Sequence, residues 1–265
     1  MSKKLVTFDL GMLYNTLSKT KARELKMLST KKERDKTGLF LAEGEKCVVD
    51  TLGAFDLQYL IATSQWLDNH EKITSAYSQN ILSTDKRGLE IVSSLGSVPE
   101  VIAVFKKNDF SHFSPTFKAD KLYLLLDEIQ DPGNLGTIIR TCDWFGVYDI
   151  FASKNTVDVY SPKVVQATMG SLSRVRVHYV DLASLIKNNR EMPLIGTLLE
   201  GEPYKKYKPG GGLLLMGNEG RGISEELKAL INVALTIPAA NSNSHPDSLN
   251  VSVATAILLA HLSPT

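Results

Sequence analysis

Short apolar runs alternate with amphipathic stretches along the second half of the chain. The run Leu122–Leu126 is apolar at every position, which is typical of a strand buried on both faces of a sheet. Five further expected strands are Asp149–Ala152, Arg174–His178, Leu194–Leu199, Leu213–Met216 and Val233–Ile237. The helices expected between and after them are Asn134–Phe145, Pro162–Gly170, Leu182–Asn189, Ser224–Ile231 and Leu249–Leu262. This order predicts an α/β fold with a parallel sheet covered on both faces.

The first half carries a similar but weaker pattern. Its expected strands are Leu39–Ala42, Leu57–Ala62 and Val101–Phe105, and its expected helices are Lys46–Leu52 and Arg87–Leu95. A polar stretch without periodicity follows, at residues 106–120. We therefore expect a smaller α/β domain over residues 1–105, a linker over 106–120 and a larger domain over 121–265.

The bulk composition is that of a globular protein. The chain has 265 residues, of which 43% are hydrophobic and 22% charged. Cys47 and Cys142 lie far apart without metal-ligand spacing and are expected to be free thiols. No apolar stretch reaches the roughly 18 residues of a membrane span, and the N-terminus has no signal-peptide core. We expect a cytoplasmic protein without a membrane segment.

The distribution of charge is uneven. Residues 1–36 hold ten Lys and Arg against four Asp and Glu, a net +6, so the remaining 229 residues carry −5. Such a basic leading segment is typical of a phosphate-binding surface or, equally, of a solvated helix face.

Three loops at expected strand ends have unusual compositions. The first, Asp127–Arg140, contains Asn134 as an expected helix N-cap and Arg140 after two isoleucines, where a surface arginine is the plainer interpretation. The second, Met216–Ser224, has three glycines around Glu219 and matches neither the P-loop nor the dinucleotide motif. The third, Ile237–Val253, leads into an apolar helix that Ser248 or Asn250 is expected to cap. Because ligands bind at the carboxyl ends of parallel strands, three such loops together indicate a binding site.

These three segments resemble the three motifs of the SpoU (TrmH-like) family of RNA ribose 2′-O-methyltransferases, of the SPOUT class. The Asn-x-Gly-x-x-x-Arg motif matches Asn134–Arg140, and the Gly-x-Glu-Gly-x-Gly motif matches Gly217–Gly222. Ile-Pro followed by Ser-Leu-Asn-Val-Ser matches Ile237–Pro238 and Ser248–Ser252, although the segment between them is longer than is typical of the family.

The resemblance implies a SPOUT domain with a deep trefoil knot, a homodimer formed through this domain, and an active site shared across the dimer interface. It implies S-adenosylmethionine as the cofactor and no metal. The implied cofactor-binding residues are Leu198, Gly217, Ile237 and Leu249.

The first half resembles the family's substrate-binding domain, an L30e-like fold shared with RNA-binding ribosomal proteins, on the stretch Lys31–Gly44. This resemblance favours rRNA, of the 23S type, over tRNA. Lys31, Lys32 and Arg34 are the candidate RNA-binding residues.

A ribose 2′-hydroxyl is a poor nucleophile, so the enzyme must align it with the methyl carbon and stabilise the negative charge that develops on its oxygen. The resemblance implies Arg140 as the base that takes the proton. Because a guanidinium keeps its own proton to above about pH 12, we prefer Arg140 as the group that stabilises this charge, and the identity of the base stays open. Asn134 is expected to orient the loop and the ribose, and Glu219 to hold Arg140 or the glycine-rich loop. Ser248 and Asn250 are expected to complete the catalytic pocket.

Three alternatives stay open at this point. The chain could methylate tRNA, or it could be a non-catalytic RNA-binding protein that retains the SPOUT fold, for which the long third loop is the support. A nucleotide-binding α/β enzyme acting on small molecules is the third, and the basic leading segment argues against it.

Overall fold

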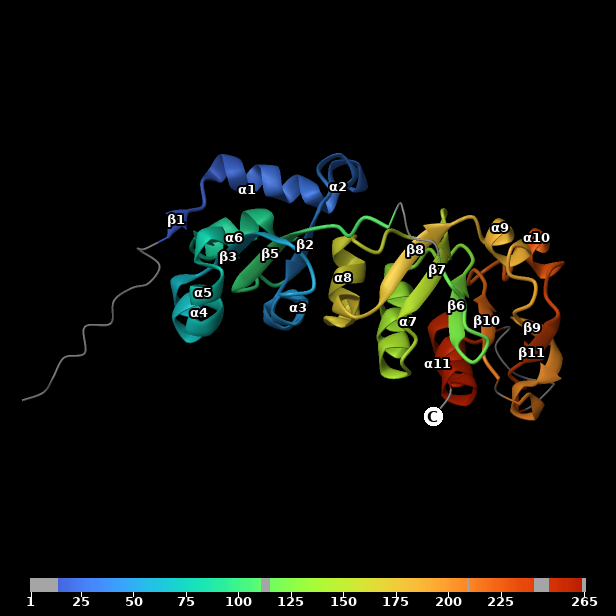
Figure 1. Cartoon of the computed structure of the whole chain (residues 1–265). Coiled ribbons are helices and arrows are strands. Elements are labelled where there is room, and N and C mark those ends of the chain that lie inside the picture. The colour runs from blue at the N-terminus through green and yellow to red at the C-terminus, as the bar shows by residue number, and fades with distance from the viewer. Residues whose placement is uncertain (1–13, 111–114, 209, 241–247, 264–265) are drawn as a thin grey trace, which may run out of the picture. The chain divides into compact units, whose positions relative to one another are not determined.

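The computed structural model describes residues 14–110, 115–208, 210–240 and 248–263 (Figure 1). The chain forms two compact units. The first contains the described residues up to Asn108 together with Tyr160–Gln166, and the second contains the rest. None of the described helices combines the length and the apolarity that crossing a bilayer requires.

The first unit is built on a mixed five-stranded sheet in the order β1-β4-β3-β5-β2. Its strands are β1 (Asn15–Thr16), β2 (Leu39–Glu43), β3 (Leu57–Ala62), β4 (Ile81–Ser83) and β5 (Val101–Lys106). Its helices are α1 (Lys19–Lys26), η2 (Met27–Ser29), α2 (Lys31–Thr37), α3 (Glu45–Thr51), α4 (Ser64–Asn69), α5 (Glu71–Ala76), η3 (Ser78–Asn80) and α6 (Lys86–Val92).

Strand β5 lies inside this sheet, between β3 and the edge strand β2. It pairs antiparallel with both β2 and β3 and is buried on both faces. Ile102 and Val104 pack into a core with residues of α1 and α6, whereas Phe105 packs with Phe40 and Phe55 on the other face. The α/β prediction for this half is confirmed, and the expected strand Val101–Phe105 is an interior strand of its sheet.

The second unit is built on a six-stranded, entirely parallel sheet in the order β11-β9-β10-β6-β7-β8. The strands are β6 (Leu122–Leu126), β7 (Asp149–Ser153), β8 (Arg176–Val180), β9 (Leu194–Pro203), β10 (Gly212–Met216) and β11 (Val233–Thr236). Its helices are α7 (Pro132–Trp144), η4 (Ser171–Ser173), α9 (Leu182–Lys187), η5 (Tyr204–Lys206), α10 (Glu225–Lys228) and α11 (Val251–Leu262). Helix α8 (Pro162–Thr168) belongs to the first unit up to Gln166 and to the second from Ala167.

Alternating residues of the central strands divide between the two faces of this sheet. Leu125, Leu213 and Leu215 pack into a core with residues of α9 and α10. On the other side α7 and α11 pack against each other (Figure 1). The predicted parallel sheet is confirmed, while the trefoil knot stays a prediction.

Helix α7 begins earlier than its apolar pattern predicts. Asp131 is its N-cap and accepts a hydrogen bond from the backbone of Asn134 at 2.7 Å, with Pro132 in the first turn. The prediction that Asn134 caps this helix is therefore wrong, because an aspartate three residues earlier satisfies the free N–H groups first. Gly136 lies against α8, and a Cβ there would come within 2.3 Å of the Cβ of Ala167.

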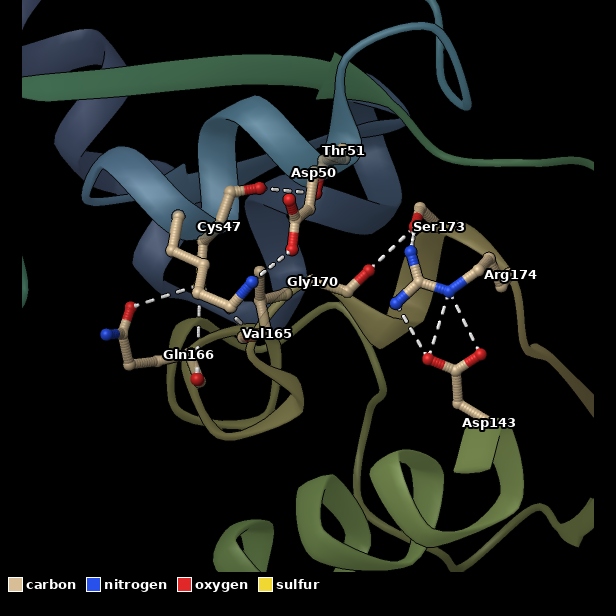
Figure 2. Close-up of polar contacts among 10 residues, drawn as sticks. Cys47, Asp50, Thr51, Asp143, Val165, Gln166, Gly170, Ser173 and Arg174 are labelled. Atoms are coloured by element: carbon tan, nitrogen blue, oxygen red, sulfur yellow. Dashed lines mark hydrogen bonds and ion pairs between the residues drawn. The ribbon is translucent and has the colours of Figure 1, made fainter. Parts of the chain in front are cut away.

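Both cysteines are free thiols, as predicted, and both are buried. The Cys47 Sγ lies 3.7 Å from Oε1 of Gln166 within the first unit (Figure 2). Burial raises the pKa of the Cys142 thiol.

Asp149 anchors the edge of the parallel sheet. Its carboxylate accepts hydrogen bonds from Arg176 at 2.7 Å and from His178 at 2.8 Å on the neighbouring strand. Burial tends to raise the pKa of Asp149, but these bonds from His178 and Arg176 outweigh it and lower the pKa to about 2.

We predict that Asp149→Asn lowers the free energy of unfolding at pH 7 by about 1–2 kcal/mol. Because the pKa is lowered in the folded state, the stabilisation is present above the ordinary pKa near 3.8 and is lost as the pH falls through about 2. Urea unfolding measured between pH 7 and pH 2 tests this. Asp35→Asn, which removes an exposed carboxylate paired with Lys31 and Lys107, is the control and should cost less than about 1 kcal/mol. A difference between wild type and Asp149→Asn that stays constant from pH 4 to pH 2 contradicts the assignment.

Candidate active site

A cavity of about 750 Å³ lies at the carboxyl ends of β9, β10 and β11 in the second unit. This volume is within the range of sites that hold small molecules. All four predicted cofactor-binding residues line it, namely Leu198, Gly217, Ile237 and Leu249. Of the predicted catalytic residues, Glu219 and Ser248 line it as well.

An irregularity in β9 forms one wall of the cavity. Gly196 pairs with Ala234 of β11, but the next residue of β11, Leu235, pairs with Glu202. The intervening residues 197–201 are therefore not paired in register with β11, and most of them line the cavity. The sequence predicts a strand that ends at Leu199, because this irregularity interrupts the apolar pattern before the strand resumes.

The opposite wall is the glycine-rich loop Gly217–Gly222. Asn218 closes it: its backbone is hydrogen-bonded in both directions with that of Gly222 at 2.9 Å. Its Oδ1 also accepts from the backbone of Gly220 and Arg221. A Cβ at position 217 would lie 2.3 Å from backbone atoms of Gly222 and Ile223, so the tight loop requires a glycine there.

The side chain of Asn134 joins the three predicted loops. Its Nδ2 donates to Glu219 Oε1 at 2.9 Å, and its Oδ1 accepts from Asn250 Nδ2 at 2.9 Å. Asn250 is the N-cap of α11, because its Oδ1 accepts from the backbone of Ser252 and Val253. A continuous polar chain, Glu219–Asn134–Asn250, therefore lies beside the cavity.

Arg140 lies apart from this chain. It is exposed on α7, does not line the cavity, and makes no hydrogen bond or ion pair with the part of the chain that the structure describes. Glu219 accepts its hydrogen bond from Asn134 instead. We expected Glu219 to hold either Arg140 or the glycine-rich loop. The expected contact with Arg140 is wrong within one chain.

The three predicted RNA-binding residues lie on α2, and their exposure differs. Lys31 and Lys32 are exposed, and Lys31 forms an ion pair with Asp35. Arg34 is only 2% exposed, and its guanidinium donates to the carbonyl oxygens of Leu28 and Ser29 at 2.9 Å. The prediction that Arg34 contacts RNA at the surface is therefore wrong. Its guanidinium instead supports the backbone of η2.

Two residues that our sequence reasoning did not select hold the loops in place. Asp127 is buried and accepts a hydrogen bond from the backbone of Ser224 at 2.8 Å, which fixes the start of α10. Glu128 contacts the glycine-rich loop. The signal in the sequence that could have identified them is their position, because two acidic residues directly follow the buried strand β6. The long part of the third loop, residues 241–247, lies outside the described residues.

Comparisons with known proteins agree with this geometry. The SpoU rRNA methylase family matches residues 121–260, and the MRM3-like substrate binding domain matches residues 19–103. The chain belongs to the SpoU rRNA methylase family. Membership confirms the predicted family and enzyme class: the chain is an S-adenosylmethionine-dependent RNA methyltransferase.

Individual relatives cover nearly the whole chain. The 23S rRNA (guanosine(2553)-2′-O)-methyltransferase RlmP of Bacillus subtilis is 30% identical over 91% of this chain and 95% of its own length. The AdoMet-bound rRNA methyltransferase of Sinorhizobium meliloti has a TM-score of 0.79 and 29% identity, over 93% of this chain and 95% of that one. The 23S rRNA (uridine(2479)-2′-O)-methyltransferase of Streptomyces viridochromogenes is 28% identical over 88% of this chain and 85% of its own length.

We predict that Asn134→Ala lowers the rate of methyl transfer at least about 100-fold, because Glu219 and Asn250 lose the group that aligns them. The free energy of unfolding should fall by only about 1–2 kcal/mol. Asn188→Ala, at an exposed asparagine directly after α9 and away from the cavity, is the matched control and should retain the wild-type rate. A single-turnover assay with labelled cofactor measures both. Equal rates for the two variants would remove Asn134 from the site.

Proposed function

We propose that this protein is a cytoplasmic homodimer that transfers the methyl group of S-adenosylmethionine to the 2′-hydroxyl of a ribose in 23S-type rRNA. The observation that carries the proposal is the polar chain Glu219–Asn134–Asn250 beside a cavity of cofactor size. Relatives similar along nearly the whole chain are named as enzymes of this activity on 23S rRNA, including RlmP of Bacillus subtilis.

The residues of the cavity suit the cofactor. Leu198, Ile237 and Leu249 offer apolar surface to the adenosine portion, and the glycine-rich loop offers backbone amides and carbonyls. When bound, the cofactor supplies a methyl group activated by the positive charge of its sulfonium. Gly217 keeps the loop narrow enough to leave this space open.

The polar chain positions the ribose whose 2′-hydroxyl accepts the methyl group. Asn134 fixes the carboxylate of Glu219 at the cavity and receives the amide of Asn250, so each side chain has one defined orientation. Ser248 and Asn250 hold the ribose against this chain. Arg140 stabilises the negative charge that develops on the 2′-oxygen as its proton leaves.

Arg140 acts in this proposal at the site of the partner subunit. It is exposed on α7, one turn before Trp144, whose side chain is 85% exposed. The adjoining helix α11 carries no Asp, Glu, Lys or Arg, yet Val253 on it is 47% exposed. A helix that is apolar on all sides is normally buried, so the exposed surface of α7 and α11 suits a second copy of this chain.

The first domain, residues 1–105, selects the RNA in this proposal, and residues 106–120 link it to the methyltransferase domain, residues 121–265. Lys31 and Lys32 provide positive charge for phosphate groups. Arg34 supports the backbone beneath them without touching RNA.

We predict that Arg140→Ala abolishes methyl transfer to 23S rRNA, with a loss of at least about 100-fold, while cofactor affinity stays within about twofold of wild type. The reason is that Arg140 lies outside the cofactor cavity. Transfer of tritiated methyl groups to rRNA from a strain that lacks the gene measures the first quantity, and calorimetry measures the second. Near-normal transfer by this variant would exclude the assigned role, and absence of transfer by the wild-type protein would exclude the proposed function.

We further predict that replacing Lys31 and Lys32 by alanine reduces the slope of log affinity against log salt by about 2 in magnitude, since each phosphate contact contributes about 0.9. Filter binding of an rRNA fragment at several salt concentrations provides the measurement. Lys72→Ala, an exposed lysine on α5, is the control and should leave the slope unchanged. Arg34→Ala should lower the free energy of unfolding by about 2–3 kcal/mol and leave the slope unchanged. An unchanged slope in the double variant would remove both lysines from the RNA-binding surface.

A further inference from the structure

Glu128 holds an unusual backbone conformation between β6 and α7. Its φ angle is +55°, in the left-handed region that residues with a Cβ rarely adopt. Among the described residues, Met169 is the one other non-glycine residue with a positive φ. A glycine at position 128 would take this conformation without steric conflict, so the glutamate side chain requires an explanation of its own.

All four polar positions of Glu128 are engaged. Its backbone N–H donates to Ser153 Oγ at 2.8 Å, and its carbonyl oxygen accepts from Asn218 Nδ2 at 2.8 Å. In the carboxylate, Oε1 accepts from Asn155 Nδ2 at 2.8 Å and Oε2 forms an ion pair with Arg221. The backbone and the side chain of one residue therefore connect the end of β7 to the glycine-rich loop.

These contacts hold the glycine-rich loop at two separate points. Asn218 is at the base of the loop, where its Oδ1 accepts from the backbone N–H groups of Gly220 and Arg221. Arg221 is three residues further along, and its side chain reaches the Glu128 carboxylate. Between these two points lies Glu219, which both lines the cavity and meets Asn134.

We propose that Glu128 is a positioning residue for cofactor binding: with Arg221 it forms a latch that holds the glycine-rich loop as one wall of the cavity. The inference rests on the proposed function, since it takes this cavity as the S-adenosylmethionine site. The left-handed backbone is what lets the carbonyl oxygen meet Asn218 while the carboxylate meets Arg221.

The latch should affect binding more than folding. The side chain of Arg221 is 69% exposed, and an ion pair to so exposed a group adds little to the stability of the fold. The ion pair acts locally on the glycine-rich loop. This loop contains three glycines and would sample many conformations without the pair.

The variant Glu128→Gly separates an effect on cofactor binding from an effect on folding. It removes the carboxylate and at the same time relieves the left-handed conformation, so the melting temperature should equal or exceed that of wild type. The affinity for S-adenosylhomocysteine, a probe that binds without reacting, should fall about tenfold in calorimetry. Arg221→Gln should cause a similar loss of affinity, and the double variant should be no weaker than either single variant, because both remove the same latch.

The matched control breaks an exposed arginine–carboxylate pair elsewhere in the same unit. Arg174 binds Asp143 at 2.7 Å away from the cavity lining (Figure 2). Arg174→Gln should leave the affinity for S-adenosylhomocysteine unchanged.

Two results would overturn the latch. One is a Glu128→Gly protein that binds the probe as tightly as wild type. The other is a loss of affinity that comes with a fall in melting temperature, which would make Glu128 a residue of the fold. A wild-type protein that does not bind the probe would instead overturn the proposed function, so the two failures are distinguishable.

Discussion

One amide side chain joins the three loops of the candidate active site. Asn134 donates a hydrogen bond to Glu219 on the glycine-rich loop and accepts one from Asn250 at the start of α11. A neutral amide has both a donor and an acceptor, whereas a carboxylate at this position could not donate to Glu219. Three loops, separated by up to 116 residues, are therefore aligned by a group that no charged residue can replace.

Helix α7 supplies this amide because its first turn and one of its faces are fixed. Asp131 caps its first turn, and Gly136 lets it approach α8 closely. Its apolar residues recur at helical spacing toward the core, namely Leu135, Ile138, Ile139 and Cys142. The exposed face then carries Arg140 outward. In the proposed function, the same helix holds one group for the site of its own subunit and presents another to a neighbouring copy.

The sequence predicts the strands of the second unit well, because residues buried on both faces leave continuous apolar runs. Leu122–Leu126 in the second unit has the bounds that the pattern predicts, and so does Leu57–Ala62 in the first. Short elements such as β1, β4, α4 and α5 leave no such run, since each covers only part of the core. The apolar pattern does not reveal which residue caps a helix, so the observed start can differ by about two residues from the expected one. Helix α7 is the example, since Asp131 caps it.

The sequence motifs indicate where the site is, but the contacts between its residues can be read only from the structure. The resemblance selects residues that do meet at one cavity, including Leu198 and Gly217. It does not reveal that Glu219 meets Asn134 rather than Arg140, or that Arg34 is buried under η2. It also passes over Glu128, because a glutamate in a left-handed conformation has no signature in the sequence.

The central claim is that each active site combines Asn134 of one subunit with Arg140 of the other. Mixing Asn134→Ala and Arg140→Ala proteins after unfolding and refolding them together tests it most directly. In a mixed dimer, one of the two sites then has both native residues. With random pairing, methyl transfer to 23S rRNA should return to about a quarter of the wild-type rate, although each variant alone is inactive. A mixture that stays as inactive as its two components would contradict the shared site.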